Sequence, residues 1–264
     1  MKTVGLIAAM SMESQALLRM VKEPKRIKLG QFKGYRFQLP LWDCVLVECG
    51  WGMFRAEEAT EVLIDQVHPA LLVSFGIAGA VEAELNIGDV VCAVNHFLLQ
   101  NGKIQKKKAS SSLSPSAQRA IEKSLKPGGA RLYSGTTVTT RGSQLIPKNP
   151  EALTHPVLEM ETAGIVQAAI ETRIPLISLR GISDGPVAPI PFDLDAMVDE
   201  DYRMHMGKVI LAILKRPAIL AQALNMSKNS KLAADNAAIA TLAALELQHP
   251  IPEINIGLGN FCKI

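Results

Sequence analysis

Cysteine, net charge and long apolar runs are all scarce in this chain, and each shortage excludes a class of protein. The 264 residues include four cysteines, without the CxxC or Cys/His spacing of a metal site. A formal net charge of +3 is too small for a chain that binds nucleic acid or another polyanion over its whole surface. No apolar run approaches the ~20 residues that a transmembrane helix needs. We therefore expect a globular protein with neither nucleic acid nor a resident metal as partner.

The first residues and the cysteines favour a cytoplasmic location. Residues 1–3 lead directly into a short apolar run at 4–9, which is too short for the core of a signal peptide. Cys44, Cys49 and Cys92 lie in or beside apolar runs. Buried free thiols in a reducing compartment are the expected outcome.

Complete nucleotide-binding loops are also missing. Residues 73–79 (VSFGIAG) follow an apolar run but have neither the full GxGxxG spacing nor a P-loop lysine, which disfavours dinucleotide and ATP binding. Gly76 and Gly79 would still let a ligand approach the backbone closely. Glycines at strand ends are common turn formers, so this segment alone does not define a site.

Apolar runs of strand length alternate with helical patterns, which predicts a single α/β domain with a mixed, mainly parallel sheet flanked by helices. Five helices are expected ahead of residue 215, from 3.6-residue periodicity. The predicted strands are 4–9, 35–39, 44–49, 70–75, 89–94, 132–139 and 176–181, and the predicted helices are 12–20, 55–66, 114–124, 160–172 and 202–214.

Two regions depart from this alternation. Residues 102–112 are basic and serine-rich, which predicts a solvated surface loop. From residue 215 the chain becomes rich in Ala and Leu, and we predict a catalytic domain at 1–214 and a helical C-terminal extension at 215–264. That extension is expected to pack on the core, with pairing to another subunit or contact with a membrane surface as alternatives.

Acidic residues follow two of the predicted strands. Glu13 comes shortly after the first strand, at the start of a helix, and Glu159 and Glu161 flank Met160 at the start of another. A helix N-terminus stabilises carboxylates, so helix capping alone would explain all three acids. An ionised glutamate is also a pure acceptor, which suits two neighbouring sugar hydroxyls.

Arg180 and Asp184 lie near the end of the strand predicted at 176–181. Arg180 stands inside an apolar run and needs a partner, because buried charges are normally paired. Asp184, in Ser-Asp-Gly-Pro, either caps a turn or transfers protons in the crevice where such strands end.

In order and spacing, these segments resemble the purine nucleoside phosphorylase/nucleosidase superfamily, most closely its methylthioadenosine/S-adenosylhomocysteine nucleosidase branch. The resemblance covers about residues 4–212, and it implies that family's three-layer fold and a homodimer with Trp51, Met53 and Phe54 near the subunit contact; ordinary core positions are the alternative for these three. It is carried by residues 5–13 (GLIAAMSME), 49–53 (CGWGM), 75–79 (FGIAG), 86–90 (NIGDV), 159–163 (EMETA) and 180–184 (RGISD).

The resemblance implies a role for each acid. Asp184, oriented by Ser183, would protonate purine N7 so that the base can leave. Glu161 would hold the ribose 2′- and 3′-hydroxyls with Met160 packed against the sugar. No metal or organic cofactor is implied. Glu13, helped by Arg180, would position and deprotonate the attacking water, while Gly79, Ile77, Val138 and Thr139 would contact the substrate.

Departures from the family pattern refine this expectation. Phosphorylases of the superfamily hold phosphate with arginines near the first strand, whereas here the loop after Ala8 has none before Arg19, so hydrolysis is favoured over phosphorolysis. Ile77 replaces a small polar residue of the nearest nucleosidases, and prolines at 186, 189 and 191 stiffen the loop after Asp184. A larger or more apolar 5′ group than methylthio is therefore expected.

The C-terminal segment points in the same direction. Residues 216–224 (RPAILAQAL) and 229–237 (NSKLAADNA) resemble the extension of hopanoid-associated nucleosidase/phosphorylase relatives, which implies adenosylhopane as substrate and peripheral contact with the inner membrane face. A methylthioadenosine/S-adenosylhomocysteine nucleosidase and a phosphate-dependent phosphorylase are the alternatives. A catalytically silent nucleoside-binding or membrane-associated protein is the rival from outside the enzymes.

Overall fold

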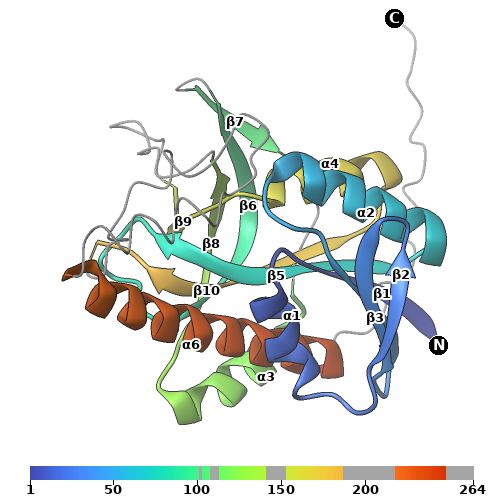
Figure 1. Cartoon of the computed structure of the whole chain (residues 1–264), viewed down its shortest axis with the longest axis horizontal. Helices are drawn as coiled ribbons and strands as arrows, with labels where there is room; N and C mark the ends of the chain where they lie inside the picture. The colour runs from blue at the N-terminus through green and yellow to red at the C-terminus, as the bar shows by residue number, and fades with distance from the viewer. Residues whose placement is uncertain (101–102, 108–112, 141–152, 187–217, 248–264) are drawn as a thin grey trace, which may run out of the picture.

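The computed structural model describes residues 1–100, 103–107, 113–140, 153–186 and 218–247, with side chains described from 225 onward in the last range. Ten strands and five α-helices make up this part of the chain (Figure 1). The strands are β1 (Lys2–Ala8), β2 (Lys25–Leu29), β3 (Phe32–Gln38), β4 (Trp42–Glu48), β5 (Leu71–Ala80), β6 (Val90–Gln100), β7 (Lys103–Lys107), β8 (Leu132–Thr139), β9 (Pro156–Glu159) and β10 (Leu176–Asp184). The helices are α1 (Ser11–Leu18), α2 (Met53–Val67), α3 (Pro115–Leu125), α4 (Thr162–Thr172) and α6 (Ala218–Leu247), with a 3₁₀ turn, η1, at Lys126–Gly128.

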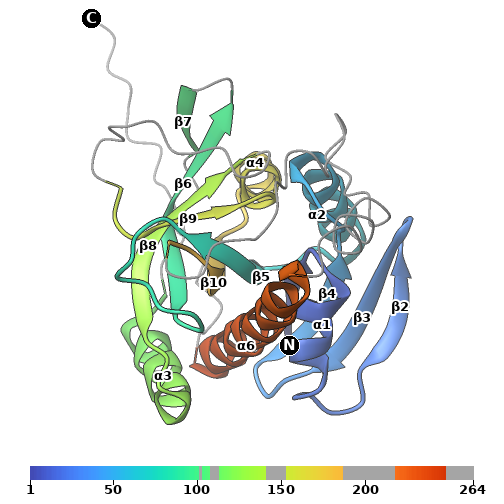
Figure 2. The same ribbon diagram turned by 60° about the vertical axis from the view of Figure 1, so that its left-hand side comes forward.

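All ten strands belong to one mixed sheet in the order β10-β6-β8-β9-β5-β1-β4-β3-β2, with β7 paired to β6. Because β5 also pairs with β10, the strands β5, β10, β6, β8 and β9 form a closed circuit of hydrogen-bonded neighbours. The other strands extend from β5 as an arm, seen on the right in Figure 2. β4, β1, β5 and β10 run parallel, so their carboxyl ends share one edge, where α/β sheets bind ligands.

Helices cover both faces of the sheet and complete three layers (Figure 1). On one face α1, α3 and α6 contribute Leu17, Ile121 and Ala238 to a common apolar cluster with the sheet. On the other face α2 and α4 contribute Leu63 and Ile165 to a second cluster. The three-layer α/β fold expected from the sequence is thus confirmed.

α6 is part of this core. A Cβ atom on Gly181 of β10 would overlap the carbonyl of Ala233, so the helix backbone lies directly against the strand. Asn236 donates from Nδ2 to the carbonyl oxygen of Gly88 at 2.7 Å, and Arg19 pairs with Asp235 at 2.6 Å. Packing of the C-terminal segment on the core is confirmed. The boundary at 214 lies outside the described residues, so the division into domain and extension stays a prediction.

Several elements differ from the expectation. β2 and β9 were not predicted, and within the basic segment residues 103–107 form the edge strand β7 rather than a loop. Its lysines suit an edge, because charged side chains discourage pairing with a further strand. The predicted helix at 202–214 lies outside the described residues. Cys44, Cys49 and Cys92 are buried free thiols, as predicted. Among the described helices, none is both long and apolar enough to cross a membrane.

Candidate active site

Two glycines of β5 make room for two acids at the carboxyl edge of the sheet. A Cβ atom on Gly76 would overlap the carboxylate of Glu13, and one on Gly79 would stand 2.6 Å from Asp184 Oδ2. The space that the sequence analysis assigned to a ligand at these glycines is therefore used by side chains of the chain itself. Since Glu13 belongs to α1 and Asp184 ends β10, β5 unites acids from distant parts of the sequence.

Glu13 is 3% exposed and lies in the first turn of α1. Its Oε2 accepts hydrogen bonds from the backbone N–H groups of Ala9 (2.8 Å) and Met10 (2.9 Å), and its Oε1 accepts one from Ile77 of β5 (2.9 Å). Burial raises the pKa of Glu13, while these three bonds and the positive charge of Arg180 oppose the rise. One oxygen thus caps the start of the helix, and the other connects α1 to the glycine turn.

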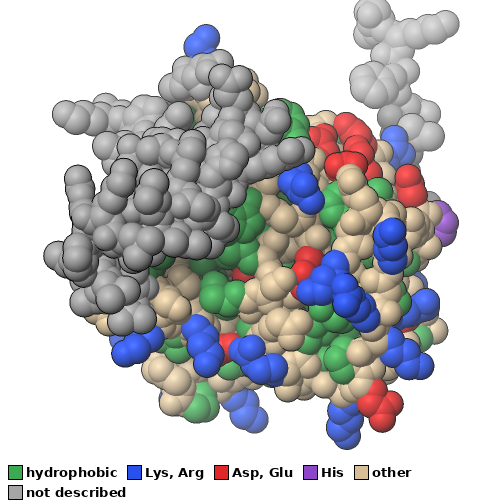
Figure 3. Space-filling model, viewed as in Figure 1, with side chains coloured by type: hydrophobic (Ala, Val, Ile, Leu, Met, Phe, Trp, Pro, Cys, Tyr) green, Lys and Arg blue, Asp and Glu red, His purple; other side chains and the backbone are tan. Residues whose placement is uncertain are grey.

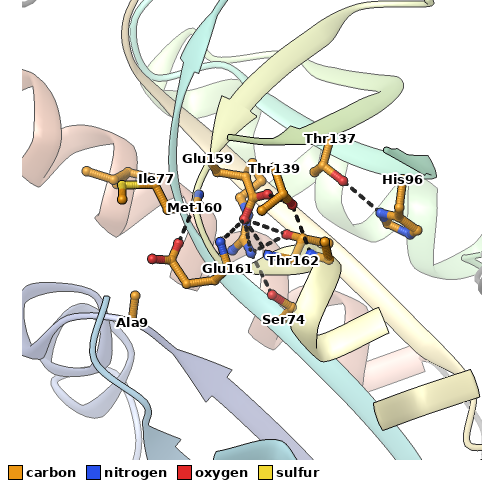
Figure 4. A network of polar contacts seen from close by, with 12 residues as sticks. Ala9, Ser74, Ile77, His96, Thr137, Thr139, Glu159, Met160, Glu161 and Thr162 are labelled. Atoms are coloured by element: carbon orange, nitrogen blue, oxygen red, sulfur yellow. Dashed lines mark hydrogen bonds and ion pairs between the residues drawn. The ribbon is translucent and has the colours of Figure 1, made fainter. Parts of the chain in front are cut away.

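Glu161 precedes α4 and belongs to the other face of the sheet. Its Oε1 accepts the N–H of Gly52, the residue before α2, at 2.9 Å, and its Oε2 lies 3.3 Å from the N–H of Met160. Burial, followed by the negative charge of Glu159, raises the pKa of Glu161 to about 8. In Figure 4 its carboxylate points away from that of Glu159, toward the side where Ile77 lies.

Asp184 and Ser183 form a pair at the end of β10. Ser183 Oγ donates to Asp184 Oδ1 at 2.5 Å, so the serine hydroxyl contacts the carboxyl group that the resemblance expects it to orient. Burial raises the pKa of Asp184, against the opposing effect of the Ser183 hydroxyl. An aspartic acid that keeps its proton closer to neutral pH is suited to general acid catalysis.

Arg180 is 4% exposed, and its predicted need for partners is met from two directions. Its Nη2 donates to Ser74 Oγ at 2.6 Å and to Thr162 Oγ1 at 2.8 Å, and lies 3.5 Å from Glu159 Oε2. Ser74 and Thr162 were not among the predicted site residues, and Glu159 was expected to be a helix-start residue. Two sequence features could have indicated them. Ser74 is a polar residue inside the apolar run 71–80, and Glu159 is the first acid of the Glu-Met-Glu motif.

The strand predicted to meet the base, β8, ends beside these acids. Val138 is fully buried, and Thr139 is 2% exposed. The Thr139 hydroxyl donates to Glu159 Oε1 and accepts the N–H of Ala163 at 2.9 Å. Thr139 therefore contributes to the polar network shown in Figure 4, and contact of residues 138–140 with a base stays a prediction.

A surface pocket of about 380 Å³ opens beside the N-terminus of α1. Ala9 and Met10 line it on the α1 side, and Gly50 and Trp51 line it on the side leading to Gly52. Lys33, Glu48 and Arg55 add charged side chains to its lining, and the three acids Glu13, Glu161 and Asp184 are not part of it.

In the described part of the chain, one group of side chains could present three ligand atoms to a metal ion. Glu82, Glu84 and His155 place these atoms within 4.8 Å of one another, and both glutamates are exposed. The acids at the end of β5 are not members of this group.

A three-layer α/β fold with buried acids at the carboxyl edge of its sheet defines an enzyme that acts on a small molecule. The chain belongs to the phosphorylase superfamily, whose family model matches residues 3–215. It is 30% identical over 199 residues to the 5′-methylthioadenosine/S-adenosylhomocysteine nucleosidase of Maridesulfovibrio salexigens, covering 69% of this chain and 85% of that protein.

Solved structures share the fold. A 5′-methylthioadenosine/S-adenosylhomocysteine nucleosidase from Neisseria meningitidis, in complex with methylthio-immucillin-A, matches with a TM-score of 0.66 at 21% identity, covering 93% of this chain and 99% of that one. The futalosine hydrolase of Helicobacter pylori matches with a TM-score of 0.66 at 14% identity, covering 93% and 97%. Because 93% exceeds the share that residues 1–214 make up, these matches extend into the C-terminal segment.

Proposed function

We propose that the protein is a purine nucleosidase that hydrolyses the N-glycosidic bond of a 5′-substituted adenosine and releases adenine. The observation that carries this proposal is the gathering of Glu13, Glu161 and Asp184 around the carboxyl end of β5, each with a raised pKa. The nucleosidase names of the relatives at 30% identity support it.

Asp184 is the general acid of the proposed reaction. Cleavage of the bond leaves negative charge on the purine, and protonation at N7 neutralises that charge as the base leaves. The raised pKa of Asp184 keeps the proton available, and the hydrogen bond from Ser183 aims the carboxyl group.

Glu161 and Glu13 act on the sugar side. Positive charge develops on the ribose as the bond breaks, so nearby carboxylates stabilise the transition state. Glu161 accepts hydrogen bonds from the two ribose hydroxyls, with Met160 against the ring. Glu13, near the positive charge of Arg180, orients the water and takes its proton.

Water rather than phosphate is the proposed nucleophile, because the loop between β1 and α1 has no arginine to hold phosphate. The test is to incubate the enzyme with adenosine nucleosides in the presence and absence of inorganic phosphate and to identify the sugar product. The free sugar, still carrying its 5′ group, is expected without phosphate. A requirement for phosphate, with ribose 1-phosphate as product, would establish a phosphorylase instead.

For the 5′ group we propose an apolar substituent, with adenosylhopane as the substrate. Ile77 at the glycine turn and the likeness of residues 216–224 and 229–237 to hopanoid-associated relatives support this choice. A panel of adenosines with 5′ groups from hydroxyl to long alkyl, assayed for adenine release, tests it. Efficient cleavage of methylthioadenosine without cleavage of adenosyl lipids would favour the methylthioadenosine alternative.

The proposal includes a homodimer and contact with the inner face of the membrane. Phe54 is 57% exposed beside the partly buried Trp51 and Met53, which suits a subunit contact. On α6, Lys228 and Lys231 are exposed, and Figure 3 shows basic side chains along the lower part of the face that carries this helix. Light scattering tests the dimer, and sedimentation with anionic lipid vesicles tests the membrane contact.

A further inference from the structure

Glu159 is a buried acid near the site, with 1% of its side chain exposed. The sequence suggests no more than a helix-start residue. Part of its hydrogen bonding fits that role, because Oε2 accepts the N–H of Thr162 at 2.7 Å and its hydroxyl at 2.7 Å. Helix capping explains neither the donor on its other oxygen nor the arginine beside it.

Those remaining contacts join Glu159 to three elements of the sheet edge. Thr139 of β8 donates to Oε1, the N–H of Glu161 donates to Oε2 at 3.0 Å, and Arg180 of β10 places Nη2 at 3.5 Å from Oε2. Figure 4 shows the carboxylate at the centre of these bonds. A single carboxyl group thus touches the strand predicted to meet the base, the sugar acid and the arginine.

Arg180 connects Glu159 to Glu13, the acid proposed to activate water. Its Nη2 faces Glu159, while its Nη1 would stand 3.2 Å from a Cβ atom on Gly76, the position that the Glu13 carboxylate occupies. The guanidinium is rigid and planar, so fixing one end fixes the other. Movement of Glu159 would therefore change the positions of both Glu161 and the guanidinium beside Glu13.

We propose that Glu159 is a positioning residue that holds Glu161 and Arg180 in register with each other. This proposal rests on the proposed nucleosidase function. It assigns the two acids of the Glu-Met-Glu motif different tasks: Glu161 meets the sugar, and Glu159, buried behind it, sets where Glu161 and the guanidinium stand.

The charge of Glu159 gives this role a measurable signature. It is the largest electrostatic cause of the raised pKa of Glu161, and the other charged or titratable groups facing that carboxyl are Glu13, Arg180 and Cys49. Ionised Glu161 is the form that accepts hydrogen bonds from the sugar hydroxyls. KM should therefore fall as the pH rises through the pKa of Glu161. Removing the charge of Glu159 lowers the pKa of Glu161, so the fall in KM moves to lower pH.

The test compares Glu159→Gln and Glu159→Asp with the wild type, using Glu171→Gln on the exposed side of α4 as the matched control. For Glu159→Gln we expect kcat to fall about 10–100-fold, because small misplacements of reacting groups are costly, and the KM profile to move to lower pH. Glu159→Asp keeps the charge and should leave the KM profile in place and recover part of kcat. Glu171→Gln should change neither.

Two outcomes separate the possible failures. If the wild-type enzyme releases adenine but Glu159→Gln has an unchanged KM profile and loses activity only in proportion to its folded fraction, Glu159 is merely structural and the proposal is wrong. If the wild type releases no base from any nucleoside of the panel, the proposed function itself is wrong. Should Glu159→Gln not fold, Thr139→Val removes one donor to the same carboxylate, and an unchanged kcat in that variant overturns the proposal.

Discussion

Gly76 matters because of a side chain from another element rather than because of its own backbone. Its φ angle is one that any residue can adopt, but a Cβ atom would displace the carboxylate of Glu13 from the N–H of Ile77. For Gly76→Ala we expect a loss of about 10–100-fold in kcat from misplacement of this acid, with the fold kept because the side chain can swing away.

Steady-state kinetics on Gly76→Ala checks this expectation, with Gly128→Ala as the control. Gly128 has open space where its Cβ would be, so that variant should match the wild type. In a double-mutant cycle, Gly76→Ala should cost little once Glu13→Ala is present, since the two changes act on one group. Fully additive losses would contradict the argument.

Asp184→Asn separates an enzyme from a silent binding protein. The asparagine keeps the shape of the side chain but has no acidic proton for the base, so we expect turnover to fall by about 10²–10⁴-fold. Binding of an adenosine ligand, measured by calorimetry, should be largely kept. Unchanged turnover would remove Asp184 from the chemistry.

At the scale of elements, the contact between α6 and β10 leaves no room for a side chain at Gly181. Gly181→Ala would place a methyl group against the carbonyl of Ala233, which belongs to a packed backbone. We expect a loss of about 1–3 kcal/mol in the free energy of unfolding, as is usual for overpacking. Urea denaturation measures it, and Gly128→Ala again serves as the control. A neutral result would mean that α6 is held loosely.

The elements that the sequence predicts are those whose pattern agrees with their surroundings. β1 and β10 are apolar runs buried on both faces, and α4 begins at Thr162, whose N–H is accepted by the preceding Glu159, so local pattern and burial coincide. β2 and β7 are charged strands at edges, and β9 has only four residues. Each depends on pairing with a strand elsewhere in the chain, and local periodicity carries no information about such a partner.

The same distinction holds within the site. Glu13, Glu161 and Asp184 follow strands or begin helices, so their places at the sheet edge could be predicted. Ser74 and Thr162 both accept from Arg180, and these contacts depend on how α4 lies against β10 and β5. Such hydrogen-bond partners depend on how the elements pack in three dimensions, and local sequence patterns do not predict that packing.

Considered as a whole, the molecule carries carboxyl groups that oppose its own stability at neutral pH. The pKa of Glu161 is raised to about 8, well above that of an unfolded glutamate, about 4.3. Over this window the unfolded chain loses the proton first, so the folded state binds more protons and stability falls as the pH rises. The raised pKa values of Glu13 and Asp184 act in the same direction.

Glu161→Gln should therefore be more stable than the wild type, and its advantage should grow between pH 5 and pH 8. Thermal unfolding at several pH values measures it, with Glu171→Gln, an exposed acid on α4, expected to show no such trend. A constant difference between Glu161→Gln and the wild type at all pH values would show that the charge is not the cause. Gain of stability with loss of activity is common where polar groups are buried for function.

The place of α6 against Gly181 also matters for the order in which the chain is synthesised. Asp184 emerges from the ribosome about 50 residues ahead of Ala233, a delay of roughly 3–10 s at common elongation rates. Until the helix arrives, the face of β10 beneath the acids is bare and its apolar neighbours are open to water. For several seconds a nascent chain of this protein thus carries all its proposed reacting groups but lacks the helix that packs against β10.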